Sequence, residues 1–164
     1  MATSMVTGGT SGIGREFVTQ LAARGDDIVI VARDTERMAA IKDDAEARYG
    51  VSVETIAADL SCREDVDRIA TRVEDPNHPI DLLVNNAGFA VHAKILDTDT
   101  LELQDRAFEV MMRAVLVLSA AAGRAMKARG HGAILNLSSS SAWINTGNYS
   151  AVKAWVLTFT ADRK

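Results

Sequence analysis

Two patterns of apolar residues alternate along the chain. Short runs of consecutive apolar residues, bounded by Gly, Asn or Asp, predict strands that are buried on both faces. Longer segments with apolar positions at helical spacing predict the helices between them. The expected strands are residues 4–7, 27–32, 52–57, 82–85 and 133–137, and the expected helices are residues 12–24, 35–49, 63–73, 101–129 and 148–164.

Strands that alternate with helices predict an α/β fold with a parallel sheet. The pattern favours a Rossmann-like, doubly wound sheet of five strands in a three-layer α/β/α arrangement. With 164 residues the chain is long enough for one core and too short for two ordinary domains. Residues 1–164 are therefore expected to form a single domain.

The expected helix at 101–129 is unusual because its middle, residues 110–118, is apolar on nearly every side. One sheet can cover only one face of a helix. We expect the remaining faces to pack on a second copy of the chain, which predicts a homo-oligomer through the helices at 101–129 and 148–164. Burial inside the chain's own core is the alternative.

Composition and charge exclude several classes of protein. A hydrophobic content of 48% with 24% charged residues is typical of a globular protein, and a net charge of −4 with scattered Lys and Arg offers nucleic acid no basic surface. The apolar runs are far shorter than the roughly 20 residues of a membrane span, and the N-terminus has no export signal. Cys62, the one cysteine, cannot form an internal disulfide, and the three histidines are not spaced as metal ligands. We expect a cytoplasmic protein without a metal site.

A glycine-rich turn, Thr-Gly-Gly-Thr-Ser-Gly-Ile-Gly at residues 7–14, follows the first expected strand. Gly8 can make the sharp turn, Gly12 leaves room for phosphates, and Gly14 permits close packing of helix on strand. Backbone N–H groups at the helix start can then bind a pyrophosphate. Such turns also occur without a ligand, and the spacing matches neither Gly-x-Gly-x-x-Gly nor a triphosphatase loop. The cofactor-binding candidates here are Gly8, Thr10, Ser11, Gly12, Ile13 and Gly14.

Polar or small residues follow the next three expected strands. Arg33 stands where a carboxylate would hold a ribose 2′-hydroxyl, and a cation there suits a 2′-phosphate, which favours NADP over NAD; a solvated surface arginine is the alternative. Asp59, followed by Leu60, can reach an adenine edge. Because the carboxyl ends of parallel strands meet at one edge of a sheet, these residues are expected to share one crevice with Asn86, Ala87 and Gly88.

The candidate reaction site follows the fifth expected strand. Tyr149 and Lys153 are four residues apart and so share one helix face. A nearby ammonium stabilises a phenolate, which makes the phenol a usable proton donor or acceptor near neutrality. A serine hydroxyl across the crevice can orient a substrate oxygen. We predict Ser139, Tyr149 and Lys153 as catalytic, with Ser138 and Ser140 as alternatives to Ser139 in the serine run.

Together these motifs resemble the short-chain dehydrogenase/reductase family. The matching positions are Thr-Gly-x-x-x-Gly-x-Gly at 7–14, Asn-Asn-Ala-Gly at 85–88, the serine at 139 and Tyr-x-x-x-Lys at 149–153. The resemblance implies NADP(H)-dependent hydride transfer between the nicotinamide and the carbon of a small carbonyl or alcohol substrate. It also implies that Tyr149 is the acid/base, that Lys153 binds the nicotinamide ribose and that Ser139 steadies the substrate, while the cofactor carries the difficult chemistry.

Three departures from the family pattern bear on activity. Met111 stands where the family has an Asn that organises a bridging water, and a thioether cannot donate that hydrogen bond. The serine run lies closer to Tyr149 than is usual. The sequence also ends before the family's last strands and substrate lid, which leaves the fifth strand as an edge with unpaired backbone groups.

These departures leave a second hypothesis open, in which the chain is a truncated relative that binds dinucleotide or pairs with other subunits without turnover. A third, a methyltransferase that uses S-adenosylmethionine, shares the opening strand–helix–strand unit. It predicts an acidic residue where Arg33 stands and gives no role to Tyr149 and Lys153.

Overall fold

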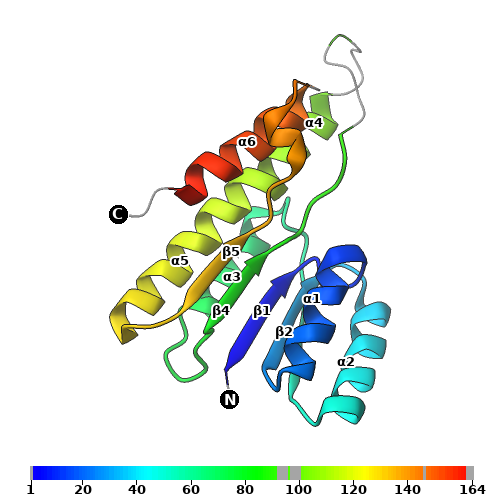
Figure 1. The fold of residues 1–164 in the computed structure, drawn as a ribbon, viewed down its shortest axis with the longest axis vertical. Helices are drawn as coiled ribbons and strands as arrows, with labels where there is room; N and C mark the ends of the chain where they lie inside the picture. The colour runs from blue at the N-terminus through cyan, green and yellow to red at the C-terminus, as the bar shows by residue number, and fades with distance from the viewer. Residues whose placement is uncertain (1, 92–95, 97–100, 146, 162–164) are drawn as a thin grey trace.

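The chain forms a five-stranded parallel sheet between two layers of helices (Figure 1). The structure, a computed structural model, describes residues 2–91, 96, 101–145 and 147–161. Its strands, in the spatial order β3-β2-β1-β4-β5, are β1 (Thr3–Thr7), β2 (Asp27–Ala32), β3 (Val53–Ala57), β4 (Leu82–Asn85) and β5 (Ala133–Asn136). Its helices are α1 (Gly12–Ala23), α2 (Thr35–Tyr49), α3 (Arg63–Val73), α4 (Leu101–Phe108), α5 (Ala114–Arg129) and α6 (Asn148–Ala161). The predicted Rossmann-like α/β fold is confirmed.

Both faces of the sheet are buried, which explains the consecutive apolar residues in its strands. Val6, Ile28 and Ile30 belong to a core with α1 and α2. Met5 and Val29 point to the other face and belong to a core with α3, α5 and α6. Because successive strand residues point to opposite faces, a strand covered on both sides needs apolar residues at nearly every position.

The strand register brings the carboxyl ends of neighbouring strands to one edge of the sheet. Val6 of β1 pairs with Ile30 of β2 on one side and with Val84 of β4 on the other. Asn85 at the end of β4 pairs in turn with Asn136 at the end of β5. The turns that follow these strands therefore lie side by side, as the sequence predicts.

The prediction of one continuous helix over residues 101–129 is wrong in its middle. A π-helical turn, η2 (Glu109–Arg113), separates α4 from α5, and the Ala114 N–H donates to the Glu109 carbonyl five residues before it. Such π turns are frequent at functional sites. The other elements end within one residue of their expected bounds, apart from residues 162–164 of the last helix, which lie outside the described residues.

Much of the apolar surface of α5 lies in the chain's own core. Ala114, Leu118 and Ala122 are almost fully buried, whereas Leu116 is 45% exposed. Phe108, at the end of α4, is 41% exposed. The exposed apolar surface of α5 that a second copy of the chain could cover is thus smaller than the sequence suggests. The homo-oligomer stays a prediction.

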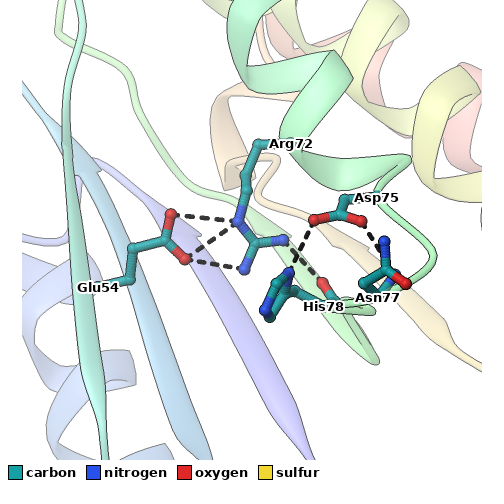
Figure 2. Close-up of polar contacts among 5 residues, drawn as sticks. All are labelled: Glu54, Arg72, Asp75, Asn77 and His78. Atoms are coloured by element: carbon teal, nitrogen blue, oxygen red, sulfur yellow. Dashed lines mark hydrogen bonds and ion pairs between the residues drawn. The ribbon is translucent and has the colours of Figure 1, made fainter.

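A cluster of ion pairs and hydrogen bonds fixes the edge strand β3 (Figure 2). The Arg72 guanidinium at the end of α3 donates to the Glu54 carboxylate of β3 at 2.8–3.1 Å and to the His78 carbonyl at 2.7 Å. The Asp75 carboxylate accepts from the Asn77 N–H and contacts the His78 ring nitrogen at 2.8 Å. This cluster joins β3, α3 and the loop before β4, and a charged side chain on an edge strand discourages pairing with other chains.

Candidate functional site

A cavity of about 720 Å³ opens at the carboxyl ends of the strands. Its volume is in the range of sites for small molecules and cofactors, which is roughly 300–1,000 Å³. Every residue that the sequence analysis proposed for catalysis or cofactor binding lines this cavity: Gly8, Thr10, Ser11, Gly12, Ile13, Gly14, Arg33, Asp59, Leu60, Asn86, Ala87, Gly88, Ser139, Tyr149 and Lys153. The structure therefore brings together residues from six separate segments of the chain.

The glycine turn after β1 can be built only with glycine at its most crowded point. A Cβ atom on Gly14 would lie 2.2 Å from the Gly8 carbonyl oxygen and 2.4 Å from Nδ2 of Asn86. Gly12, in contrast, has φ +51° and open space on its side-chain side. Ser11 precedes α1 and makes no side-chain hydrogen bond to its first turn. Amide donors at a helix start, beside an open surface, fit a pyrophosphate.

The turn after β4 is held against the glycine turn by hydrogen bonds. The Thr7 hydroxyl accepts from the backbone N–H groups of Asn86 and Ala87 at 3.0 and 3.1 Å. The Asn86 amide donates in return to the Thr7 carbonyl at 2.9 Å. Thr7 is only 1% exposed, so these bonds are shielded from water. They fix the spacing between two walls of the cavity.

Asp59 and Arg33 lie at the end of the cavity formed by β2 and β3. Oδ1 of Asp59 accepts from the backbone N–H and the hydroxyl of Ser61 at 2.9 and 2.7 Å, and Oδ2 accepts from Nη2 of Arg106 at 3.1 Å. Burial raises the pKa of Asp59, but the Ser61 hydrogen bonds and the charges of Arg106 and Arg33 outweigh it and hold that pKa below its ordinary value of 3.8. Asp59 is thus an ionised hydrogen-bond acceptor at neutral pH.

One wall of the cavity, which α4 and η2 provide, was not predicted from the sequence. Leu103, Arg106 and Val110 all line it. Their spacing of three and four residues places them on one face of a helix, and this was the available signal. The apolar pattern of the segment was instead interpreted as core or interface. The pairing of Arg106 with Asp59 joins residues 47 positions apart, which the sequence does not reveal.

Lys153 and Tyr149 lie at the opposite end of the cavity, on the first turns of α6. Lys153 is only 5% exposed, and its Nζ donates to the Leu137 carbonyl at 2.8 Å. Nζ also lies 5.8 Å from the centre of the Tyr149 ring. Burial lowers the pKa of Lys153 below its ordinary value of 10.5. The structure thus places the Lys153 ammonium over the ring of Tyr149, one turn away on the same helix.

The three candidate serines have different surroundings. The Ser138 hydroxyl donates to the Lys153 carbonyl at 2.7 Å and so fastens α6 to the end of β5. The Ser139 hydroxyl oxygen accepts from the Ser141 N–H at 3.1 Å and precedes the short 3-10 helix η3 (Ser140–Trp143), which leaves its hydrogen available to a ligand. Ser140 does not line the cavity. Of the two that line the cavity, Ser139 is the one whose hydroxyl hydrogen has no acceptor among the described residues.

Met111 lies on the π-helical turn and is 1% exposed. A Cβ atom added to Gly88 would lie 3.0 Å from the Met111 sulfur, so the thioether packs directly against the turn after β4. Its side chain fills this space without offering a hydrogen-bond donor.

The described residues contain no group of three or more His, Cys, Asp or Glu arranged to hold a metal ion, and His92 lies outside them. No helix in the described parts of the chain is long and apolar enough to cross a bilayer.

The parallel sheet and its cavity at the strand ends define a Rossmann-type NAD(P)-binding fold. The sequence profile of the family described as short chain dehydrogenase matches residues 2–163. The chain belongs to the short-chain dehydrogenase/reductase family.

Solved and curated relatives agree with this assignment. The bulky-bulky ketone specific alcohol dehydrogenase from Comamonas testosteroni superposes with a TM-score of 0.93 at 29% identity, over 98% of this chain and 65% of that chain. A short-chain dehydrogenase from Sphingobium yanoikuyae, solved in complex with NADPH, superposes with a TM-score of 0.92 at 33% identity, over 97% and 62%. The 3-oxoacyl-[acyl-carrier-protein] reductase FabG of Aquifex aeolicus is 30% identical over 160 residues, which are 96% of this chain and 64% of that protein. The chain thus spans less than two thirds of the length of these relatives.

Proposed function

We propose that this chain carries the cofactor site and the proton-transfer residues of an NADP(H)-dependent oxidoreductase. The reaction is hydride transfer between the nicotinamide and the carbon of a carbonyl or alcohol. The observation that carries the proposal is one cavity, lined at one end by the glycine turn and at the other by Ser139, Tyr149 and Lys153. Two solved relatives in complex with NADPH support it, the Sphingobium enzyme and the L-sorbose reductase of Gluconobacter frateurii.

The bound nicotinamide supplies or accepts the hydride, and the chain's own side chains handle the proton. In reduction the Tyr149 hydroxyl donates its proton to the carbonyl oxygen, and in oxidation the phenolate takes that proton back. The Lys153 ammonium, 5.8 Å from the ring centre, stabilises the phenolate form. The Ser139 hydroxyl, whose hydrogen has no acceptor among the described residues, binds the same substrate oxygen and orients it.

Arg33 supports NADP over NAD. It lines the cavity at the end of β2, where its guanidinium can bind a 2′-phosphate. Asp34, the next residue, turns its carboxylate to the N–H and guanidinium of Arg37 and caps α2. The acidic residue of this segment is therefore already engaged, and the cationic one faces the cavity.

Met111 supports a second candidate, dinucleotide binding without turnover. Its buried thioether occupies the position of the family's water-organising Asn and packs against Gly88 without a donor. In this version the glycine turn and Arg33 still hold the cofactor. The two candidates differ only in proton transfer. Cytoplasmic location and homo-oligomer formation stay predictions under both.

The test follows NADPH fluorescence during titration of the chain, and then NADPH oxidation with a panel of ketones and aldehydes. We expect binding and turnover, and we expect Tyr149→Phe to reduce turnover by about 10²- to 10⁴-fold, because it removes the acid/base, while cofactor affinity stays nearly unchanged. Binding without oxidation across the panel favours the second candidate. A fully active Tyr149→Phe variant excludes the proposed role of Tyr149.

Arg33→Asp tests the cofactor preference in the same titration. The change replaces a cation by an anion that repels a 2′-phosphate and can accept from a 2′-hydroxyl. We expect the preference for NADPH over NADH to reverse. An unchanged ratio of the two dissociation constants contradicts the role given to Arg33.

A further inference from the structure

The first turn of α6, which carries Tyr149, is weakly held by its own backbone. The first hydrogen bond of the helix, from the Ala151 N–H to the Gly147 carbonyl, is 3.3 Å long, whereas such bonds are usually about 2.9–3.0 Å. The first N–H groups of any helix have no partner inside it. Gly147, just before α6, is exposed and has φ +96°. The direction of this turn therefore depends on contacts with other parts of the fold.

One such contact is a hydrogen bond to α4. The side-chain amide of Asn148, the first residue of α6, donates to the side-chain carbonyl of Gln104 at 2.6 Å. Gln104 is 4% exposed, and a hydrogen bond in such surroundings is stronger than one in water. The bond joins residues 44 positions apart. It ties the start of α6 to the helix that forms one wall of the cavity.

A second tie fastens α6 to the residues that follow β5. The Ser138 hydroxyl donates to the Lys153 carbonyl at 2.7 Å, and Nζ of Lys153 donates to the Leu137 carbonyl at 2.8 Å. This tie lies one helical turn beyond Tyr149, so it fixes the lysine without fixing the first turn by itself. Tyr149 thus lies between the tie at Lys153 and the tie at Asn148.

We propose that Gln104 is a positioning residue for proton transfer, which holds the first turn of α6 through Asn148 so that the Tyr149 hydroxyl meets the substrate oxygen. This inference rests on the proposed function. It gives a role to a residue outside the cavity, because neither Gln104 nor Asn148 lines it. Gln104 acts through the start of α6 and not on the reacting atoms.

Proton transfer is sensitive to such positioning. A general acid must come within about 2.6–3.2 Å of the oxygen that takes its proton. A misplacement of about 1 Å can cost on the order of 100-fold in rate. Under the proposed function, cofactor affinity depends mainly on the glycine turn and on Arg33, at the other end of the cavity. Loss of the Gln104–Asn148 bond is therefore expected to lower turnover and to spare NADPH affinity.

The experiment replaces Gln104 by Met, which has a similar length but offers Asn148 no carbonyl oxygen. Fluorescence titration measures NADPH affinity, and steady-state kinetics on the panel of ketones and aldehydes measure kcat and KM. For Gln104→Met we expect kcat to fall about tenfold, with NADPH affinity within about twofold of that of the unchanged chain. Asn148→Ala removes the same bond from the other side. It should lower kcat to a similar degree, and the double variant should lose no more than either single variant.

The Tyr149→Phe background separates positioning from general damage to the fold. In single-turnover measurements with the chain in excess over NADPH, Gln104→Met should change the residual rate of Tyr149→Phe by less than about twofold, because the acid that it positions is already absent. Thr160→Val is the matched control. The Thr160 hydroxyl accepts from the Asn136 amide at 3.1 Å near the far end of α6, and its loss should leave kcat unchanged.

The outcomes distinguish this inference from the proposed function. A Gln104→Met variant with unchanged kcat overturns the inference while the proposed function stands. An equal loss of rate in the Tyr149→Phe background, or an equal loss of kcat in Thr160→Val, overturns it as well, because Gln104 would then be a structural residue only. Failure of the unchanged chain to oxidise NADPH with any substrate of the panel overturns both turnover and this inference.

Discussion

The two ends of the cavity differ in the groups that line them, which are mainly backbone at one end and side chains at the other. At the phosphate end the walls are backbone, where Gly8 and Gly14 touch with no room for a Cβ atom beside the buried strands β1 and β2. At the proposed reaction end the candidate groups are side chains just before η3 and on α6, next to a strand, β5, whose residues are half-buried or exposed. Under the proposed function, cofactor binding would thus depend on a packed backbone, and proton transfer would depend on a less enclosed edge of the sheet.

The two edge strands show the same contrast. β3 carries Glu54, which Arg72 holds from α3 (Figure 2). β5 has the sequence Ala-Ile-Leu-Asn and no charged residue. Its Asn136 instead accepts from the Asn85 amide at 2.8 Å and donates to the Thr160 hydroxyl of α6 at 3.1 Å. β3 therefore has the charge typical of a protected edge, whereas the polar contacts of β5 point inward to β4 and α6.

Adding one methyl group at Gly14 is expected to disrupt the glycine turn at the proposed phosphate site. Gly14→Ala places a Cβ atom 2.2 Å from the Gly8 carbonyl oxygen, and that atom belongs to the backbone and cannot move aside easily. We expect NADPH affinity to fall more than about 100-fold and the free energy of unfolding to fall by about 2–3 kcal/mol, as overpacking does. Fluorescence titration and urea denaturation measure the two effects.

Gly123→Ala is the matched control. Gly123 lies in α5 with nothing within 4 Å of an added Cβ atom. Alanine there should leave NADPH binding unchanged and stabilise the chain by about 0.5–1 kcal/mol, because glycine is unfavourable inside a helix. If Gly14→Ala behaves like Gly123→Ala, the glycine turn is not the rigid cradle described above.

Two buried charged residues, Asp26 and Lys153, are expected to contribute with opposite signs to the free energy of unfolding at neutral pH. Asp26, between α1 and β2, is 5% exposed and accepts from the Ser4 hydroxyl at 2.7 Å and from Arg24. Burial opposes its ionisation, but Arg24 and Ser4 outweigh this and lower the pKa of Asp26 below 3.8. An acid with a lowered pKa stabilises the fold above its ordinary pKa, and that stabilisation is lost as the pH falls below it. We expect Asp26→Asn to cost about 1.5–3 kcal/mol at pH 7, with the difference shrinking below about pH 4, in urea denaturation.

Lys153 shows the reverse. Burial lowers its pKa from 10.5, so the unfolded chain binds more protons between the lowered value and 10.5. Stability from this group therefore rises as the pH rises through that window, and the charged lysine is a cost at pH 7. Lys153→Met should be more stable than the unchanged chain at pH 7, and its advantage should shrink towards pH 10.5. A variant less stable at pH 7 would show that the ammonium already has enough partners within the chain.

The sequence predicted most of the fold and of the cavity because both follow from local patterns. Consecutive apolar residues mark strands covered on both faces, and the turns after those strands must meet at one edge of a parallel sheet. The wall formed by Leu103, Arg106 and Val110 could not be predicted in the same way. Their helical spacing marks one face of a helix but does not say what that face meets, because the Asp59 partner of Arg106 lies 47 positions away.

The sequence favours Ser139 among the serines, and the structure adds how the surroundings of these serines differ. Ser138 and Ser139 are neighbours in a run of identical residues, and only their partners distinguish them: Lys153 for the Ser138 hydroxyl and the Ser141 N–H for Ser139. No local pattern encodes these partners, because one of them lies 15 residues away on another element.

The smallest predicted effect is that of a substitution at Met111. Met111 packs against Gly88 of the turn after β4 and lies on the π-helical turn that leads to the buried helix α5. Met111→Asn restores a donor and an acceptor at this position, and under the proposed function we expect turnover to rise about threefold, on the order of half the free energy of one hydrogen bond. NADPH affinity should not change, because the glycine turn and Arg33 are untouched. Met111→Leu, which keeps the site apolar, is the control and should leave turnover where it is. Equal gains in both variants would show that the shape of the side chain limits the reaction. A gain confined to Met111→Asn would show that turnover is limited by a missing hydrogen bond at this position, although cofactor binding is not.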